Sequence, residues 1–139
     1  MAAMSGPIVR TVLGPVSGVP LPVAPYSHAV AYGGLIYITG QMPIDPETGE
    51  LVPGGIVAQT RQVMENLKAV LSAVGSRLER ALYVRAYLTS MELYADFNSA
   101  YAAYFDAKLL PARTCVAVSG MAVGADVEID MVAAEGESA

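Results

Sequence analysis

Arg113 is the residue whose type and setting first suggest a chemical site in this sequence. It lies in the run Pro-Ala-Arg-Thr-Cys at 111–115 and is the only basic residue between Lys108 and the C-terminus. Residues 114–118 alternate as a half-buried strand would, so the guanidinium would be partly withdrawn from water. A permanently charged group in such a position needs an anionic partner.

Two kinds of anion could meet Arg113. One is a carboxylate of the protein itself, and Glu128, in the run Asp-Val-Glu-Ile-Asp at 126–130, is the obvious candidate. The other is the carboxylate of a small molecule, which the planar guanidinium can grip through two parallel hydrogen bonds. This segment alone does not decide between a structural ion pair and a substrate site.

The composition argues against several other kinds of site. The 139 residues carry a net charge of −5 and the eight Lys and Arg residues are scattered, so binding of nucleic acid through a basic patch is not expected. One histidine, His28, and one cysteine, Cys115, cannot form a metal site of the usual spacing or an internal disulfide. We therefore expect no metal, no cofactor held by the protein, and a reducing, cytoplasmic location.

The hydropathy pattern indicates a domain that associates with copies of itself rather than with a membrane. No run of 18 apolar residues predicts a transmembrane helix, and residues 1–6 lack the basic and apolar stretches of a secretory signal. With 54% apolar and 15% charged residues, the chain is expected to hide apolar surface in a subunit interface as well as in its core.

A single domain over residues 1–139, with a core at about 8–134, is predicted to hold six strands and two helices. Gly33 and Gly34 favour a tight hairpin between the second and third strands. Apolar residues at three- and four-residue spacing mark the first helix, which Gly75 would end. We expect strands at 8–13, 27–32, 35–41, 82–89, 114–119 and 127–133, helices at 56–74 and 91–107, and a frayed tail at 135–139.

This order of elements predicts an α+β fold. Strands and helices alternate too few times for a doubly wound sheet, and two helices can cover only one face of the sheet that the strands would form. The other face must be buried elsewhere, which again indicates an oligomer.

Short motifs follow one another along most of the chain. They are Ala-Pro-Tyr-Ser at 24–27, Ile-Thr-Gly-Gln-Met-Pro at 38–43, Asp-Pro-Glu-Thr-Gly-Glu at 45–50, Gln-Thr-Arg-Gln at 59–62, Asn-Leu at 66–67, Leu-Thr at 88–89, Phe-Asn at 97–98, Pro-Ala-Arg-Thr-Cys at 111–115 and Val-Glu-Ile at 127–129. From about residue 24 to 134 the sequence thereby resembles the RidA/YjgF family of reactive-intermediate (enamine/imine) deaminases. The order of so many motifs makes the resemblance specific.

The resemblance implies a chorismate-mutase-like (YjgF) α+β fold, with two helices packed on one face of a mixed sheet. It also implies a homotrimer whose sheets face one another, with an active site in each cleft between subunits. That assembly would bury the face that the helices leave uncovered. Arg113 would then face Tyr26 or Asn98 of a neighbouring subunit.

Roles follow where positions match the family's motifs. Arg113 matches the arginine that grips the substrate carboxylate, and Glu128 matches the acid thought to position water or exchange protons. Thr39 would supply a hydroxyl at the reacting centre. The residues that match the lining of the cleft are Tyr26, Gly40, Asn98 and Cys115, the last through its backbone N–H.

Three positions depart from the pattern common in the family. Thr39 stands where many members have Ser, so it keeps the hydroxyl and adds a methyl group that could narrow the pocket. His28 replaces a common Gln and Asp130 replaces a common Glu, and we interpret both as structural or supporting residues.

The predicted site residues also have structural interpretations that stay open. Tyr26 could cap a loop, and Asn98 could hydrogen-bond locally within its helix. Cys115 could be an inert apolar filler, and Gly40 could serve backbone geometry. Glu128 could be no more than the partner of the arginine.

The activity implied is hydrolysis of a 2-imino acid, or of an enamine tautomer such as 2-aminoacrylate, to the 2-keto acid and ammonia. This is a 2-iminobutanoate/2-iminopropanoate-type deaminase reaction. It needs no cofactor, because the imine carbon is already electrophilic and the protein has only to orient the substrate and handle protons. Arg113 would fix the carboxylate while water held by Glu128 or Thr39 attacks C2.

Two other functions stay open. A non-catalytic trimer could sense a small carboxylate metabolite through the same arginine, since a sensor and an enzyme need the same pocket. A ribonuclease or translation inhibitor, an activity attached to some relatives, fits less well with the acidic composition and the absence of a His pair or a Lys-rich groove. Within the first class, a specialised deaminase of a catabolic pathway is also open.

Overall fold

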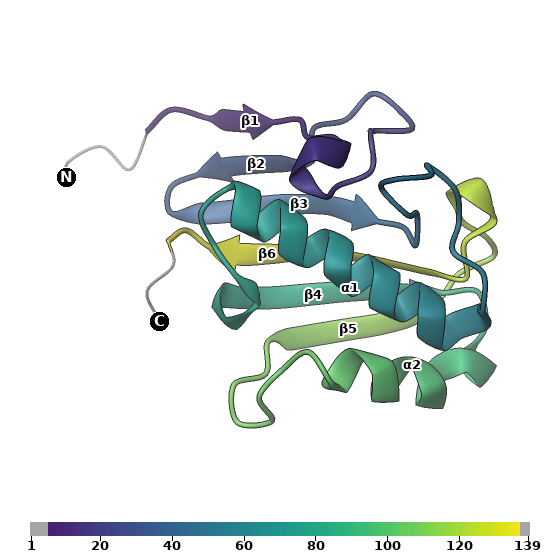
Figure 1. The fold of residues 1–139 in the computed structure, drawn as a ribbon. Coiled ribbons are helices and arrows are strands. Elements are labelled where there is room, and N and C mark those ends of the chain that lie inside the picture. The colour runs from purple at the N-terminus through teal and green to yellow at the C-terminus, as the bar shows by residue number, and fades with distance from the viewer. Residues whose placement is uncertain (1–5, 137–139) are drawn as a thin grey trace.

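Six strands form one mixed sheet in the computed structural model, which describes residues 6–136 (Figure 1). The strand order is β1-β2-β3-β6-β4-β5, and every neighbouring pair is antiparallel except β4 and β5. The predicted mixed sheet with two helices is confirmed. Its elements are β1 (Val9–Thr11), β2 (Ala29–Tyr32), β3 (Leu35–Gln41), α1 (Gly55–Ala73), β4 (Ala81–Leu88), α2 (Tyr94–Ala102), β5 (Ala112–Ala117) and β6 (Val127–Ala134).

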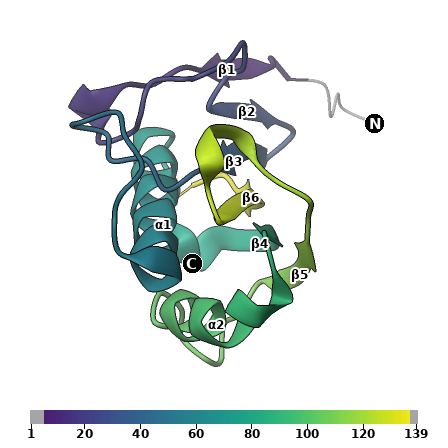
Figure 2. The same cartoon turned by 90° about the vertical axis from the view of Figure 1, so that its right-hand side faces the viewer.

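Both helices pack on the same face of the sheet. Figure 2 shows α1 along the middle of that face and α2 beside β5, where the sheet ends. The apolar stripe predicted for the first helix is the part of α1 that is buried against the strands. No helix of the described chain is long and apolar enough to cross a lipid bilayer. The fully buried centre of the core includes Ile36, Val63, Met64, Leu67, Leu71, Val84, Leu88, Phe97 and Ile129.

Glycines set the turns where the sequence places them. Gly33 and Gly34 have φ values of 62° and 84°, as a tight hairpin between β2 and β3 requires. Gly75, with φ of 78°, follows the last turn of α1, and the Ser76 N–H donates to the Leu71 carbonyl at 2.8 Å. This is the Schellman arrangement that ends a helix at glycine.

The second helix is shorter than predicted. Residues Met91–Leu93 form a single 3₁₀ turn, and α2 then ends at Ala102 rather than at residue 107. The next N–H groups, of Tyr104 and Phe105, bond to carbonyls three residues back instead of four. The Asp106 carboxylate then accepts a hydrogen bond from the Lys108 N–H at 2.9 Å, a local turn that competes with helix.

β5 begins earlier than predicted, directly after Pro111, so Arg113 lies inside the strand. The chain returns from α2 to run parallel to β4, which makes β5 the edge of the sheet. The tail predicted at 135–139 lies largely outside the described residues. Residues 1–5, part of the segment in which no secretory signal is expected, also lie outside the described residues.

The face of the sheet opposite the helices is called the open face below. Within the described residues no helix lies against it (Figure 2). Tyr37 and Tyr83 are 49% and 37% exposed there, which is unusual for large aromatic side chains in the centre of a sheet. Side chains that alternate onto this face are Tyr37, Tyr83, Arg85, Tyr87, Thr114, Val116, Glu128 and Asp130.

His28 has a structural role, as predicted. Its side chain is 2% exposed, and it joins the segment after β1 to the loop before β2. Nδ1 accepts a hydrogen bond from the Leu13 N–H at 2.9 Å, so Nε2 carries the proton and donates to the Pro20 carbonyl at 2.8 Å. The ring therefore satisfies two backbone groups that helices and strands leave without partners.

Replacing His28 by Ala should lower the free energy of unfolding by roughly 2–4 kcal/mol, because a buried ring is removed and two backbone groups lose their partner. His28→Gln keeps a side-chain acceptor and donor and should lose clearly less. Urea unfolding at a fixed protein concentration measures both. A loss below about 0.5 kcal/mol for His28→Ala would contradict this role.

Candidate functional site

Arg113 lies in the edge strand β5, with its side chain on the helix-covered side of the sheet. It pairs in register with Val84 of β4, which is fully buried on that side. The guanidinium donates two hydrogen bonds to α2, from Nη1 to Asn98 Oδ1 at 2.8 Å and from Nη2 to the Tyr94 hydroxyl at 3.1 Å. Asn98 therefore contacts Arg113 within one chain and needs no neighbouring subunit to do so.

Three aromatic rings of α2 surround the same guanidinium. Its Cζ lies 5.0 Å from the ring centre of Tyr101, 5.5 Å from that of Phe97 and 5.7 Å from that of Tyr94. These rings and Asn98 follow one another at three- and four-residue spacing, so one face of the helix presents them all. Rings at these distances attract a cation and hold it in place.

None of these partners carries a negative charge. The ion pairs within residues 6–136 are Lys68 with Glu65 and Arg85 with Asp130. The internal ion pair between Arg113 and Glu128, one of the two interpretations of the sequence, is therefore wrong. The Arg113 guanidinium is held in position without being neutralised, and this is the state in which an arginine can bind an external carboxylate.

A hollow of about 290 Å³ adjoins Arg113. The Tyr101 hydroxyl beside it is buried and has no hydrogen-bond partner in the described part of the chain. Burial raises the pKa of Tyr101 to about 12 although Arg113 opposes the shift, so the hydroxyl keeps its proton at neutral pH. The hollow is lined by Asn98, Tyr101, Ala102, Leu110, Pro111 and Arg113.

A larger hollow, of about 650 Å³, lies between the C-terminal ends of α1 and α2. It is lined by residues such as Lys68, Arg77 and Tyr104 and by none of the predicted site residues. Lys68 there is already paired with Glu65 at 3.7 Å. We therefore place the candidate site at the smaller hollow, which adjoins the charge that the protein does not neutralise.

Glu128 lies on the open face, over Gly40 of β3. A Cβ atom built on Gly40 would come within 2.9 Å of Cδ and 3.1 Å of Cγ of Glu128, so only glycine leaves the space that the carboxylate occupies. A register shift between β3 and β6 at Ile38 and Gln41 sets this close approach. Burial raises the pKa of Glu128, and the negative charge of Asp130 adds to the rise.

The remaining predicted residues have modest local roles. The Tyr26 hydroxyl accepts a hydrogen bond from the Val23 N–H at 3.2 Å, which fits the loop-capping interpretation, and Tyr26 lines one small hollow together with Gly40. The Thr39 N–H donates to the His28 carbonyl at 3.0 Å. Cys115 is half-buried against the core, and burial raises the pKa of its thiol although Arg113 opposes the shift, so the thiol is not activated.

The predicted site residues thus form two groups on opposite faces of the sheet. Arg113, Asn98 and Cys115 belong to the helix-covered side, while Glu128 and its neighbour Gly40 belong to the open face. The described residues contain no group of three or more His, Cys, Asp and Glu side chains placed to bind a metal ion. What the arrangement offers is a cation without an anionic partner in the described chain on one side and a carboxyl group with a raised pKa on the other.

The aromatic surroundings of Arg113 were missed by sequence reasoning. Tyr94, Phe97 and Tyr101 fall within the helix predicted at 91–107, but none of them was given a role beside Arg113. The signal was present in the spacing of Tyr94, Asn98 and Tyr101, which places two hydroxyls and an amide on the face that also carries the rings. What could not be foreseen was that β5 would lie directly beneath that face.

Comparison with known proteins identifies the family. The family model described as endoribonuclease L-PSP matches residues 17–135. The chain belongs to this family, which is the RidA/YjgF family that the motifs predict. A RutC family protein of Pyrococcus horikoshii is 46% identical over 114 residues, which cover 82% of this chain and 90% of that one.

Solved structures share the fold over almost their whole length. RidA from the Antarctic bacterium Psychrobacter sp. PAMC 21119 is 35% identical with a TM-score of 0.85, covering 91% of this chain and 99% of that one. TdcF of E. coli, solved with bound serine, is 27% identical with a TM-score of 0.83, covering 92% of this chain and 100% of that one. Independent comparisons of sequence and of structure therefore agree on the family and the fold.

Gly40→Ala should move the Glu128 carboxylate while leaving the fold intact, because the atoms that a Cβ would meet are the end of a flexible side chain. The measurement is the carboxyl ¹³C resonance of Glu128, assigned by its loss in Glu128→Gln. Gly120→Ala is the matched control, since a Cβ there meets no heavy atom within 4 Å. An unchanged Glu128 resonance in Gly40→Ala would contradict the packing described for this pair.

Proposed function

We propose that the protein is a hydrolytic deaminase that converts reactive 2-imino acids and their enamine tautomers, such as 2-aminoacrylate, to 2-keto acids and ammonia. The observation that carries the proposal is the Arg113 guanidinium, which two hydrogen bonds and three rings hold without any anionic partner in the described chain. The relative TdcF, solved with bound serine, supports a ligand that bears a carboxylate.

In this proposal Arg113 binds the substrate carboxylate through the part of its planar fork that faces away from α2. Asn98 and Tyr94 keep the fork from rotating, so the imine carbon is presented in one orientation. Cys115, two residues along the same strand, would line the cleft between subunits and offer its backbone N–H. Arg85 could not bind the substrate carboxylate in the same way, because its Nε and Nη2 already donate to the Asp130 carboxylate.

Glu128 and Thr39 handle water and protons. Water adds to C2, the electron pair of the C=N bond moves to nitrogen, and nitrogen takes a proton. The carbinolamine then loses ammonia as its hydroxyl oxygen becomes the keto oxygen and gives up its proton. Burial raises the pKa of the Glu128 carboxyl group and makes it a better proton acceptor than an exposed carboxylate, which suits Glu128 for this step.

The substrate would meet both groups only where two copies of the chain pack together, because Arg113 and Glu128 lie on opposite faces of one sheet. We therefore propose a homotrimer in which open faces meet and each cleft takes Arg113 from one copy and Glu128, Thr39, Gly40 and Tyr26 from its neighbour. The exposed tyrosines of the open face favour such an interface. The enzyme would work in the cytoplasm, without metal or cofactor, nucleic acid or membrane.

A carboxylate sensor is the second candidate, since the neutral surroundings of Arg113 support binding as well as catalysis. The two are separated by ammonia release from 2-aminoacrylate made in place: binding without faster release favours the sensor. The name of the matched family model makes RNA cleavage a third outcome to score. RNA cleavage that persists in Arg113→Ala would support a ribonuclease function, contrary to the expectation from the acidic composition of the chain.

Arg113→Lys should lower the rate of ammonia release by roughly 100-fold, because lysine keeps the charge but cannot form two parallel bonds to a carboxylate. The assay uses a panel of imines made in place by an amino-acid oxidase. Arg77→Lys, at an exposed arginine in the larger hollow, is the matched control and should keep full activity. Wild-type turnover in Arg113→Lys would contradict the assignment of Arg113 to the substrate site.

A further inference from the structure

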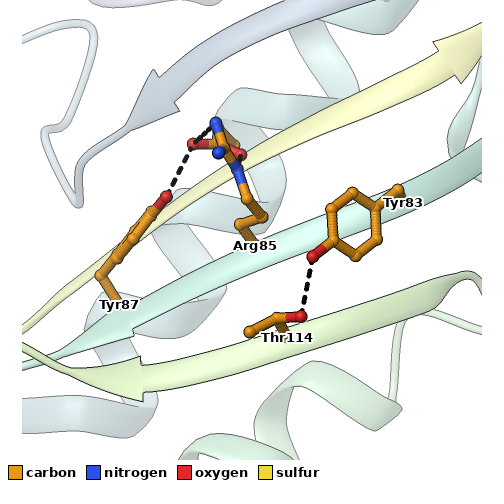
Figure 3. A network of polar contacts seen from close by, with 5 residues as sticks. Tyr83, Arg85, Tyr87 and Thr114 are labelled. Atoms are coloured by element: carbon orange, nitrogen blue, oxygen red, sulfur yellow. Dashed lines mark hydrogen bonds and ion pairs between the residues drawn. The ribbon is translucent and has the colours of Figure 1, made fainter.

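A second polar cluster lies on the open face, where Arg85 and Tyr87 of β4 meet Asp130 of β6. The Arg85 guanidinium donates from Nε to Asp130 Oδ1 at 2.8 Å and from Nη2 to Oδ2 at 3.1 Å. The Tyr87 hydroxyl donates to the same Oδ2 at 3.3 Å. Figure 3 shows the side chains of Arg85 and Tyr87 directed toward the same carboxylate, which belongs to Asp130. We call these three residues the β4–β6 network.

The β4–β6 network lies immediately beside Glu128. Asp130 follows Glu128 by two residues on β6, so their side chains stand on the same face with Cα atoms about 7 Å apart. In the antiparallel register Tyr87 lies directly opposite Glu128, and Arg85 lies directly opposite Asp130. The four side chains therefore form two adjacent cross-strand pairs, a spacing at which neighbours interact.

We propose that the β4–β6 network sets the charge state of Glu128, with Arg85 and Tyr87 acting as positioning residues through their hold on Asp130. The proposal rests on the proposed function for its catalytic meaning, since Glu128 is the proton-handling group there. Its physical content, a protonation equilibrium at Glu128 on which two opposed charges of the same chain act, is independent of any reaction.

The two charges act in opposite directions. The Asp130 carboxylate disfavours a second negative charge on Glu128, whereas the Arg85 guanidinium favours it. The other titratable side chains on this face are Tyr37 of β3, which pairs with Val132 of β6, and Tyr83, which bonds to Thr114 at 2.7 Å. Tyr32 and Arg10 share the face but lie on β2 and β1, which are not neighbours of β6. The balance at Glu128 within the described chain is therefore held by Asp130 and Arg85.

The pKa shifts of Arg85 and Tyr87 agree with this balance. Burial raises the pKa of Tyr87, and Asp130 raises it further while Arg85 opposes, so Tyr87 stays protonated and remains a donor to Asp130. The pKa of Arg85 is raised by its hydrogen bonds to Asp130, so the guanidinium stays charged.

Two charge variants should move Glu128 in opposite directions. Asp130→Asn removes the negative charge and leaves Arg85 unneutralised, so the pKa of Glu128 should fall by about one unit. Arg85→Gln leaves Asp130 unneutralised, so the pKa of Glu128 should rise by about one unit. The measurement is a ¹³C titration of the glutamate carboxyls in the folded, assembled protein, with Glu128→Gln to assign the resonance.

Tyr83→Phe is the matched control, because it removes a hydrogen bond from the same strand and face without touching Asp130. It should leave the pKa of Glu128 unchanged. An unchanged pKa in both charge variants, or shifts of the same sign, would overturn the proposal. If neither charge variant folds, Tyr87→Phe decides: a rise of a few tenths of a unit supports the network, and no change overturns it.

The titration is read without substrate, so its outcome does not depend on the deaminase assignment. If the wild-type protein releases ammonia from imines, the pH–rate profile should move with the titration, towards lower pH in Asp130→Asn and towards higher pH in Arg85→Gln. A profile that stays in place while the titration moves would deny the network a role in the reaction. Absence of ammonia release from the wild-type protein would overturn the proposed function and leave the charge balance standing.

Discussion

The alternation of side chains along neighbouring strands is the constraint on which the candidate site depends. β4 lies between β5 and β6, and it pairs Val84 with Arg113 on one side and Tyr87 with Glu128 on the other. Val84 and Tyr87 are three residues apart, so they point to opposite faces, and they carry Arg113 and Glu128 to opposite faces with them. A small molecule cannot reach through a sheet, so under the proposed function one chain would hold two halves of a site.

The chain places its two sheet arginines in contrasting surroundings. Arg85 on the open face is paired with a bidentate carboxylate, so its guanidinium is not free to bind a substrate. Arg113 on the other face has an amide, a hydroxyl and three rings, which orient it and leave its charge in place. Removing a guanidinium from water without a counter-charge is costly, so this arrangement favours any carboxylate that enters. α2 supplies all of these partners from one face.

The sequence predicted the elements, the mixed sheet and the family, because periodicity and motif order are local properties of the chain. It misjudged the end of the second helix, where an Asp106 turn competes with the helix, and it left open an Arg113–Glu128 ion pair that strand register forbids. Register depends on which strands become neighbours. β6 inserts between β3 and β4 from the far end of the chain, and no local pattern shows this. The network at Asp130 was hidden for the same reason.

The most direct test of a site shared between copies is to mix two variants that are each inactive. Arg113→Ala and Glu128→Gln, unfolded together in equal amounts and refolded, should regain up to about one quarter of the wild-type deaminase rate, because about one quarter of the clefts in mixed trimers receive both intact residues. Each variant refolded alone should stay inactive. Mixed trimers, verified by mass, that show no regained activity would contradict a site assembled from Arg113 of one copy and Glu128 of another.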